Sequence, residues 1–121
     1  MSEQYFFDTY ALFEIIYGGK KYDKYAKSGG ITTILNLAEL NYGLKKEHNA
    51  ETADKITEKY SNAIIEITLN DVKEAMTLKL SNKKLSIPDA IGYIIAKNKK
   101  IKFLTGDEGF KEMKNVEFVK K

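Results

Sequence analysis

Residues 86–110, SIPDAIGYIIAKNKKIKFLTGDEGF, decide the fold because they predict a buried helix, a strand and an acidic turn in succession. Ser86 and Asp89 fit the capping-box spacing S-x-x-[DE], and Pro88 lies in the first turn, where a missing N–H costs nothing. The residues from there to Ala96 are apolar on nearly every side, which is typical of a helix packed inside a domain. Lysines then close the C-terminal end of this helix.

The strand predicted after this helix, over residues 101–104, ends in Thr105, Gly106 and Asp107. Open α/β sheets bind their ligands outside the carboxyl ends of the strands. We therefore expect Asp107 at a ligand-binding edge. Asp89 lies at the start of the preceding helix, so the two acids lie at opposite ends of the predicted helix–strand unit.

The N-terminal part of the chain predicts a second unit of this kind. Residues 5–7 form a short continuous apolar run that ends in Asp8, as a fully buried strand would. Residues 9–17 then predict a helix that stops at two glycines, 18 and 19. An acid, Asp8, therefore lies at the joint between a strand and a helix.

The remaining segments alternate between helical and extended patterns. Helices are predicted over residues 20–27, 34–44, 50–60 and 70–80, and strands over residues 31–33, 63–68 and 116–119. Strands separated by helices favour a single α/β domain over residues 1–121, with a mainly parallel sheet. Within the helix 34–44, Glu39 lies at the edge of a broad apolar arc.

The composition excludes several classes of function. The chain has no cysteine and one histidine, which excludes a disulfide framework, a thiol nucleophile and mechanisms that need two imidazoles. Its 20 basic residues are all lysine, against 17 acids. Because a lysine ammonium acts as a point charge and lacks the planar fork of arginine, any bound polyanion would be held by point charges. No apolar run approaches the ~20 residues of a membrane span, and no signal-peptide pattern is present, so we expect a cytoplasmic protein without membrane association.

Four acidic residues are candidates for one site at the carboxyl edge of the sheet: Asp8, Glu39, Asp89 and Asp107. Taken alone, each has a structural explanation as a helix cap, a turn residue or a solvated helix residue. Together, however, they would repel one another and raise one another's pKa values unless a cation held them. Oxygen-only ligation suits Mg²⁺ or Mn²⁺, and such ions activate water for the hydrolysis of a phosphodiester.

Three segments, in this order, carry a resemblance to a known family: FFDTYAL at 6–12, LNLAELNYGL at 35–44 and the stretch 86–110. The chain resembles a PIN domain, especially the small kind found as the VapC toxin of toxin–antitoxin pairs. The resemblance implies an α/β/α sandwich with a parallel sheet and an Mg²⁺- or Mn²⁺-dependent endoribonuclease. It implies a homodimer and an antitoxin protein as partner. It also implies that the four acids hold the metal and catalyse, with the Thr105 hydroxyl supporting the site.

Two departures from the family's pattern concern RNA cleavage and binding. Many relatives have a further acid two residues after the last aspartate, where this chain has Gly109. The arginines that often help such proteins to bind RNA are absent, so lysines must substitute. Lys20, Lys21, Tyr22 and Lys24 are candidate RNA contacts, because single-stranded RNA stacks on aromatic rings beside lysines. A solvated helix face has the same pattern.

Self-association is predicted from apolar residues of the N-terminal helix. Leu12, Phe13 and Ile16, with the segment after Gly19, offer more apolar surface than so small a domain readily hides. We therefore expect this face to form an interface.

Two other functions remain open on the sequence alone. A PIN nuclease for housekeeping RNA processing or decay would carry the same four acids. A catalytically inactive PIN-fold module would keep the acids as caps and only bind RNA or protein.

Overall fold

The computed structural model describes residues 3–121 as strands and helices in alternation. The strands are β1 (Tyr5–Phe7), β2 (Gly30–Ile31), β3 (Lys102–Thr105) and β4 (Val116–Phe118). The α-helices are α1 (Thr9–Ile16), α2 (Asp23–Ser28), α3 (Ile34–Glu47), α4 (Ala50–Glu58), α5 (Leu69–Ser81) and α6 (Ile87–Asn98). Three short 3₁₀ helices are η1 (Lys20–Tyr22), η2 (Ser61–Ala63) and η3 (Glu108–Phe110).

The four strands form one parallel sheet in the order β2-β1-β3-β4. Phe6 of β1 pairs with Ile31 on one side and with Phe103 on the other. Because β1 and β3 are neighbours and run in the same direction, their carboxyl ends reach the same edge of the sheet. The predicted α/β class with a parallel sheet is confirmed.

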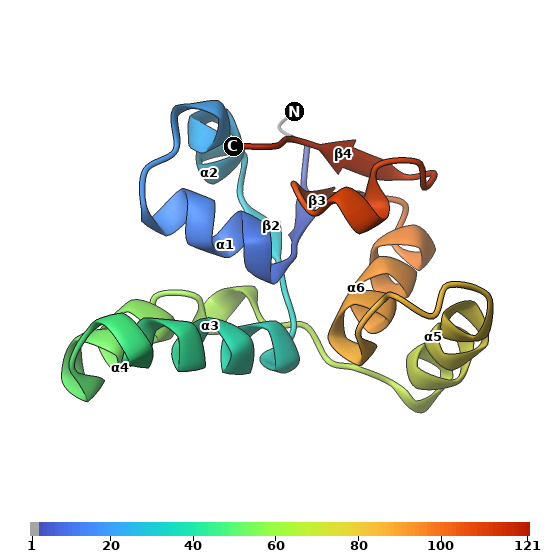
Figure 1. The fold of residues 1–121 in the computed structure, drawn as a ribbon, viewed down its shortest axis with the longest axis horizontal. Coiled ribbons are helices and arrows are strands. Elements are labelled where there is room, and N and C mark those ends of the chain that lie inside the picture. The colour runs from blue at the N-terminus through green and yellow to red at the C-terminus, as the bar shows by residue number, and fades with distance from the viewer. Residues whose placement is uncertain (1–2) are drawn as a thin grey trace.

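Side chains alternate between the two faces of the sheet, as the pleat of a strand requires. Phe6 and Phe103 belong to a core formed with α5 and α6, whereas Phe7 and Leu104 belong to a core formed with α1, α2, α3 and α4. Figure 1 shows α1 and α6 on opposite sides of the strands. The arrangement is the predicted α/β/α sandwich.

The central helix α6 begins where the capping pattern predicts. The hydroxyl of Ser86 accepts a hydrogen bond from the backbone N–H of Asp89 over 3.2 Å, and Pro88 lies in the first turn. Every residue from Ala90 to Ala96 is buried. Gly92 allows close packing on the sheet, because a Cβ there would lie 2.7 Å from the ring of Phe6.

The strand predicted over residues 63–68 is wrong. The segment leaves η2 as extended chain, and its one ladder contact within residues 3–121 is a parallel bridge between Thr32 and Ile64. Since β2 ends at Ile31, the segment has no longer strand to pair with there. Ile65 and Ile67 instead pack against the core under α5 and α6.

The predicted exposed face on α1 is also wrong. Leu12 is fully buried, and Phe13 and Ile16 pack against the core that α2 and α3 close. Large apolar side chains that do reach the surface include Tyr17 at the C-terminal cap of α1, and Ile34 and Tyr42 on α3. In the described part of the chain, no helix combines the length and apolar character that crossing a membrane requires.

Candidate active site

Asp8 and Asp107 follow neighbouring strands of the sheet. Asp8 comes directly after β1 and caps α1, where its Oδ1 accepts a hydrogen bond from the N–H of Ala11 over 2.8 Å. Asp107 comes after β3 and caps η3, where its Oδ1 accepts from the N–H of Gly109 over 2.9 Å. Both acids therefore act as helix caps and also lie at the ligand-binding edge that the sequence predicts.

The other two candidate acids come from helices. Asp89 lies half-buried in the first turn of α6, next to its cap Ser86. Glu39 lies on α3 and is exposed, and its Oε1 accepts a 2.6 Å hydrogen bond from the hydroxyl of Thr9. Because Thr9 is the first residue of α1, this bond fixes the Glu39 carboxylate beside the strand end that carries Asp8.

Asp8 has the strongest electrostatic perturbation among the acids. Its side chain is 2% exposed, and this burial raises its pKa from 3.8 to about 7. Hydrogen bonds from Thr105 and Ala11 lower the pKa, while the negative charges of Asp89 and Asp107 raise it. Asp8 is therefore a buried carboxyl group that holds its proton close to neutral pH.

The pKa of Asp89 is raised as well. Burial is the largest cause, and the charges of Asp107 and Glu39 add to it, against hydrogen bonds from Ser86 that lower the pKa. The charges of Asp89 and Asp107 thus raise the pKa of Asp8, and the charges of Asp107 and Glu39 raise the pKa of Asp89. The four acids that the sequence singles out form one electrostatically connected set.

No positive charge in the described chain compensates this set. The ion pairs within residues 3–121 join Lys45 to Asp54, Lys55 to Glu51 and Lys120 to Glu108, all on the surface. The donor chemistry, carboxylate oxygens without histidine or cysteine, fits a hard divalent cation such as Mg²⁺ or Mn²⁺. Within the same residues, however, no three acidic or histidine side chains are grouped closely enough to hold an ion. The chemistry fits a metal, and the carboxylates would have to draw together around it.

Thr105 connects two of the acids. The residue is fully buried, and its hydroxyl oxygen accepts a hydrogen bond from the N–H of Asp107 over 3.0 Å. The Thr105 side chain also lowers the pKa of Asp8. Thr105 therefore sets the position of both aspartates relative to the end of β3.

A chain of hydrogen-bonded polar side chains lies behind Glu39 and was not predicted from the sequence. Thr33 donates to Oδ1 of Asn36 over 2.7 Å, Asn36 donates through Nδ2 to the hydroxyl of Thr9 over 3.2 Å, and Thr9 donates to Glu39. Asn36 is fully buried although it is polar. Its place three residues before Glu39, on the same side of a helix, is the signal that would have found it.

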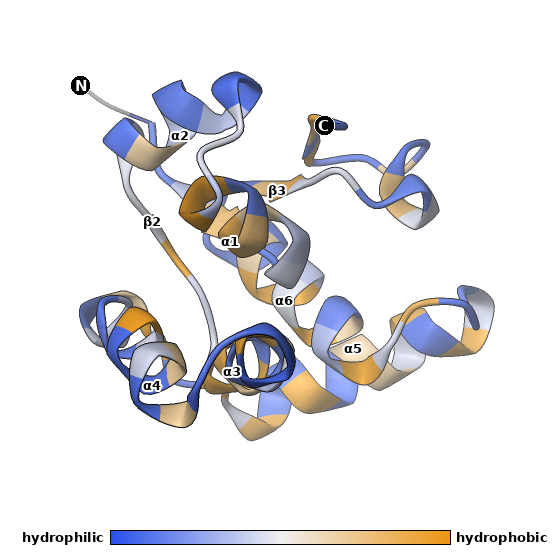
Figure 2. Ribbon diagram, turned by 60° about the vertical axis from the view of Figure 1, so that its left-hand side comes forward, coloured by the Kyte–Doolittle hydropathy of each residue, from blue (hydrophilic) through white to orange (hydrophobic). Residues whose placement is uncertain are grey.

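The lysine and tyrosine segment differs from its prediction as an RNA platform. Tyr22 is 1% exposed, and its hydroxyl donates to the carbonyl oxygen of Val119 over 2.6 Å, so it cannot stack on a base. Most of α2 is hydrophilic (Figure 2), and Lys20 and Lys24 are exposed. Lys21 is exposed too, but its ammonium donates to the carbonyl oxygen of Lys120 over 3.1 Å. The prediction is wrong for Tyr22, whereas the lysines remain accessible to solvent.

Comparison with known families identifies this arrangement. The model of the PIN domain family matches residues 5–116, from β1 to the start of β4. This chain belongs to the PIN domain family. The match spans all four candidate acids, Asp8, Glu39, Asp89 and Asp107.

Solved structures share this PIN fold. A chain of a toxin–antitoxin complex from Klebsiella pneumoniae has a TM-score of 0.74 at 21% identity, over 93% of this chain and 94% of the other. PAE2754 from Pyrobaculum aerophilum has a TM-score of 0.74 at 19% identity, over 98% and 92%. VapBC2 from Rickettsia felis, solved with a DNA fragment from its promoter, has a TM-score of 0.73 at 18% identity, over 97% and 98%. No curated protein matches the chain in sequence. At these identities, the likeness to the PIN structures establishes a common fold.

Proposed function

We propose that this PIN domain is an Mg²⁺- or Mn²⁺-dependent endoribonuclease that hydrolyses phosphodiester bonds in RNA. The observation that carries the proposal is the buried Asp8, whose pKa burial raises to about 7 while Asp89 and Asp107 lie nearby as further negative charges. Such a set costs free energy unless a cation neutralises it, and the described chain pairs none of these acids with a lysine.

The chain's own residues have distinct parts in this proposal. Asp8, Glu39, Asp89 and Asp107 would hold the metal and are the proposed catalytic acids. Thr105 would support both aspartates, since its hydroxyl accepts a hydrogen bond from the N–H of Asp107 and its side chain lowers the pKa of Asp8. A divalent cation held by these acids would activate water at neutral pH and would stabilise charge on the leaving oxygen.

Cleavage of single-stranded RNA tests this proposal. Purified protein should cut an unstructured RNA in Mg²⁺ or Mn²⁺ and stop in EDTA. Asp107→Asn and Glu39→Gln should each lower the rate by at least about a hundredfold, because each removes a proposed metal ligand. RNA affinity should remain nearly unchanged in both variants, since neither loses a lysine. Metal-independent cleavage, or full activity in both variants, would contradict the proposal.

We further propose that the protein is the VapC-like toxin of a toxin–antitoxin pair, with an antitoxin protein as partner. The likeness to the Klebsiella pneumoniae complex and to VapBC2 favours this role over housekeeping RNA processing. Expression of the chain alone should arrest bacterial growth, and Glu39→Gln should abolish the arrest. Normal growth with an active enzyme would favour the housekeeping alternative, and an inactive protein that still binds RNA would favour the binding module.

A homodimer is also proposed, on the family resemblance and on apolar side chains that the fold leaves at the surface. Ile34 and Tyr42 on α3 are 57% and 67% exposed, and Ile64 after η2 is 40% exposed. Ile34 and Ile64 border one apolar hollow between α3 and α4. Light scattering should give twice the mass of one chain, and Ile34→Lys should lower it. A monomer at high protein concentration would contradict the dimer.

A further inference from the structure

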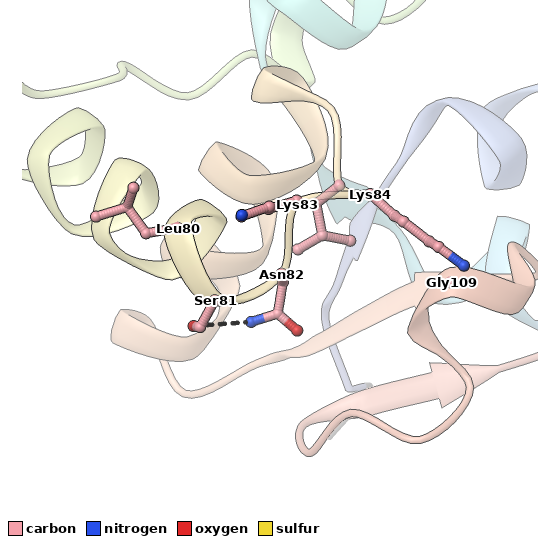
Figure 3. A pocket seen from close by; sticks show the side chains of 7 residues that line it. Leu80, Ser81, Asn82, Lys83, Lys84 and Gly109 are labelled. Atoms are coloured by element: carbon pink, nitrogen blue, oxygen red, sulfur yellow. Dashed lines mark hydrogen bonds between the residues drawn. The ribbon is translucent and has the colours of Figure 1, made fainter.

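A hollow of about 420 Å³ opens between the turn that joins α5 to α6 and the helix η3. Residues 80–85 form one wall and Gly109 forms the other (Figure 3). This volume falls in the range of small-molecule sites, which hold a ligand of roughly nucleotide size.

Both walls of the hollow are continuous with proposed active-site residues. Gly109 donates its N–H to the Asp107 carboxylate over 2.9 Å. The opposite wall ends at Leu85, directly before Ser86, which caps the helix that carries Asp89. The hollow is thus linked to Asp107 through Gly109 and to the start of the helix that carries Asp89 through Ser86.

The charge of the hollow is opposite to that of the acids. No acidic residue is among the described residues that line it, whereas Lys83 and Lys84 are exposed there. Neither lysine forms an ion pair within residues 3–121. In Figure 3 the Lys84 side chain extends toward Gly109, while Lys83 lies on the side of Leu80. The two ammonium groups are thus spread along the hollow and are free to meet an anion.

The hollow continues along the last turns of α5. A second hollow of about 300 Å³ shares Leu80 and Lys83 with the first and is completed by Met76 and Lys79. Leu80 is 75% exposed between the two. Lys79 has a structural part, because its ammonium donates to the carbonyl oxygens of Lys83 and Leu85 over 3.2 and 2.6 Å and so fixes the turn.

We propose that the groove formed by residues 76–85 and Gly109, here called the lysine groove, binds the backbone of single-stranded RNA next to the phosphate that is cut. Lys83 and Lys84 contact phosphates, and the exposed Leu80 packs against a base or ribose. Point charges on the lysines of the flanking surface attract the phosphates of a polyanion without sequence preference. This inference rests on the proposed ribonuclease function.

Binding of RNA by an inactive protein tests the lysine groove. The full chain with Glu39→Gln is titrated into a fluorescein-labelled, unstructured RNA in Mn²⁺ at several KCl concentrations. Adding Lys83→Gln and Lys84→Gln should weaken binding about tenfold at low salt and reduce the slope of log K against log salt by about 1.4, for two phosphate contacts on a single strand. Lys73→Gln with Lys97→Gln, two exposed lysines outside the groove, is the control with the same charge change and should shift affinity less than twofold.

The outcomes separate this inference from the proposed function. One outcome is that the Lys83 and Lys84 variant binds RNA like the control variant while the active protein still cleaves RNA. That result contradicts RNA binding in the lysine groove and leaves the ribonuclease proposal in place. If the active protein neither binds nor cleaves RNA, both are wrong. If the variant loses affinity for a protein partner but keeps its RNA affinity, the groove docks protein and the inference is overturned. In the active protein, the same substitutions should raise KM and leave kcat unchanged.

Discussion

The hydroxyl of Thr9 donates a 2.6 Å hydrogen bond to Oε1 of Glu39, 30 residues further along the chain. This bond joins the first residue of α1 to the middle of α3. It is the last link of the buried polar chain that starts at Thr33 and passes through Asn36. The orientation of an otherwise exposed carboxylate is thereby set from inside the fold.

Thr9→Val removes that link without changing the volume of the side chain. We expect kcat for RNA cleavage to fall about tenfold, as is typical when a partner that orients a metal ligand is lost. RNA affinity should stay unchanged, because no lysine is altered. Thr77→Val, which removes a hydroxyl that bonds only within α5, is the control and should leave kcat unchanged. Equal kcat values in the two variants would show that Thr9 does not position Glu39.

The raised pKa of Asp8 predicts how stability depends on pH in the absence of metal. Below pH 3.8, the usual pKa of Asp8, both the folded and the unfolded chain hold the proton, and Asp8 does not lower the free energy of unfolding. Between 3.8 and about 7 the unfolded chain loses the proton while the folded chain keeps it, so the free energy of unfolding falls as pH rises. Above pH 7 the full cost, at most about 4 kcal/mol, is present.

Asp8→Asn should remove this cost and keep an oxygen for the N–H of Ala11. In EDTA, thermal unfolding at pH 8 should therefore occur at a higher temperature in Asp8→Asn than in the unsubstituted protein, and the two should converge at low pH. Asp54→Asn is the control, because the exposed Asp54 has its pKa lowered by Lys45. Unfolding temperatures that differ by the same amount at every pH would contradict the prediction.

Calorimetry with Mn²⁺ tests the metal site separately from catalysis. The unsubstituted protein should bind Mn²⁺, while Asp8→Asn and Asp89→Asn should lose most of the binding, because each removes a carboxylate from the connected set. Asp54→Asn lies outside that set and should bind like the unsubstituted protein. Equal Mn²⁺ affinity in all three variants would contradict the proposed metal site.

Gly106, next to Asp107, is required by close packing. A Cβ at this position would lie 2.2 Å from the ring of Tyr10 and 2.5 Å from the carbonyl oxygen of Val119. Gly106→Ala should therefore displace the turn that holds Asp107 and lower the free energy of unfolding by about 1–3 kcal/mol. Gly109→Ala is the matched control, since its Cβ would meet only Oδ1 of Asp107, at 3.4 Å. Denaturant unfolding that shows no difference between the two variants would contradict this packing.

Local patterns predicted the elements that carry the acids. The buried run before Asp8, the capping residues around Asp89 and the strand before Asp107 are short-range signals, and the structure confirms each element. The alternation of strands and helices also predicted the parallel direction of the strands, whereas the structure supplies the pairing of β1 with β3. The positions of Asp8 and Asp107, directly after neighbouring strands, were therefore accessible from the sequence.

Features that depend on tertiary packing were not accessible in the same way. The pattern of lysines and tyrosines after Gly19 reads as a solvated face, but the hydroxyls of Tyr22 and Tyr25 bond to the C-terminal segment, nearly a hundred residues away. The apolar residues 63–68 have strand character, yet β2 is too short to pair with them. In both cases a distant contact decides the local outcome.

The ends of the RNA products test the ribonuclease proposal most directly. If activated water attacks the phosphorus and the 3′ oxygen is the leaving group, the cut RNA carries a 5′-phosphate and a 3′-hydroxyl. No 2′,3′-cyclic phosphate forms, because the attacking oxygen does not come from the ribose 2′-OH. We expect these ends in Mg²⁺ or Mn²⁺, no products in EDTA, and no products above background from Asp89→Asn. Products with a 2′,3′-cyclic phosphate, or undiminished cleavage by Asp89→Asn, would contradict the role of the four acids.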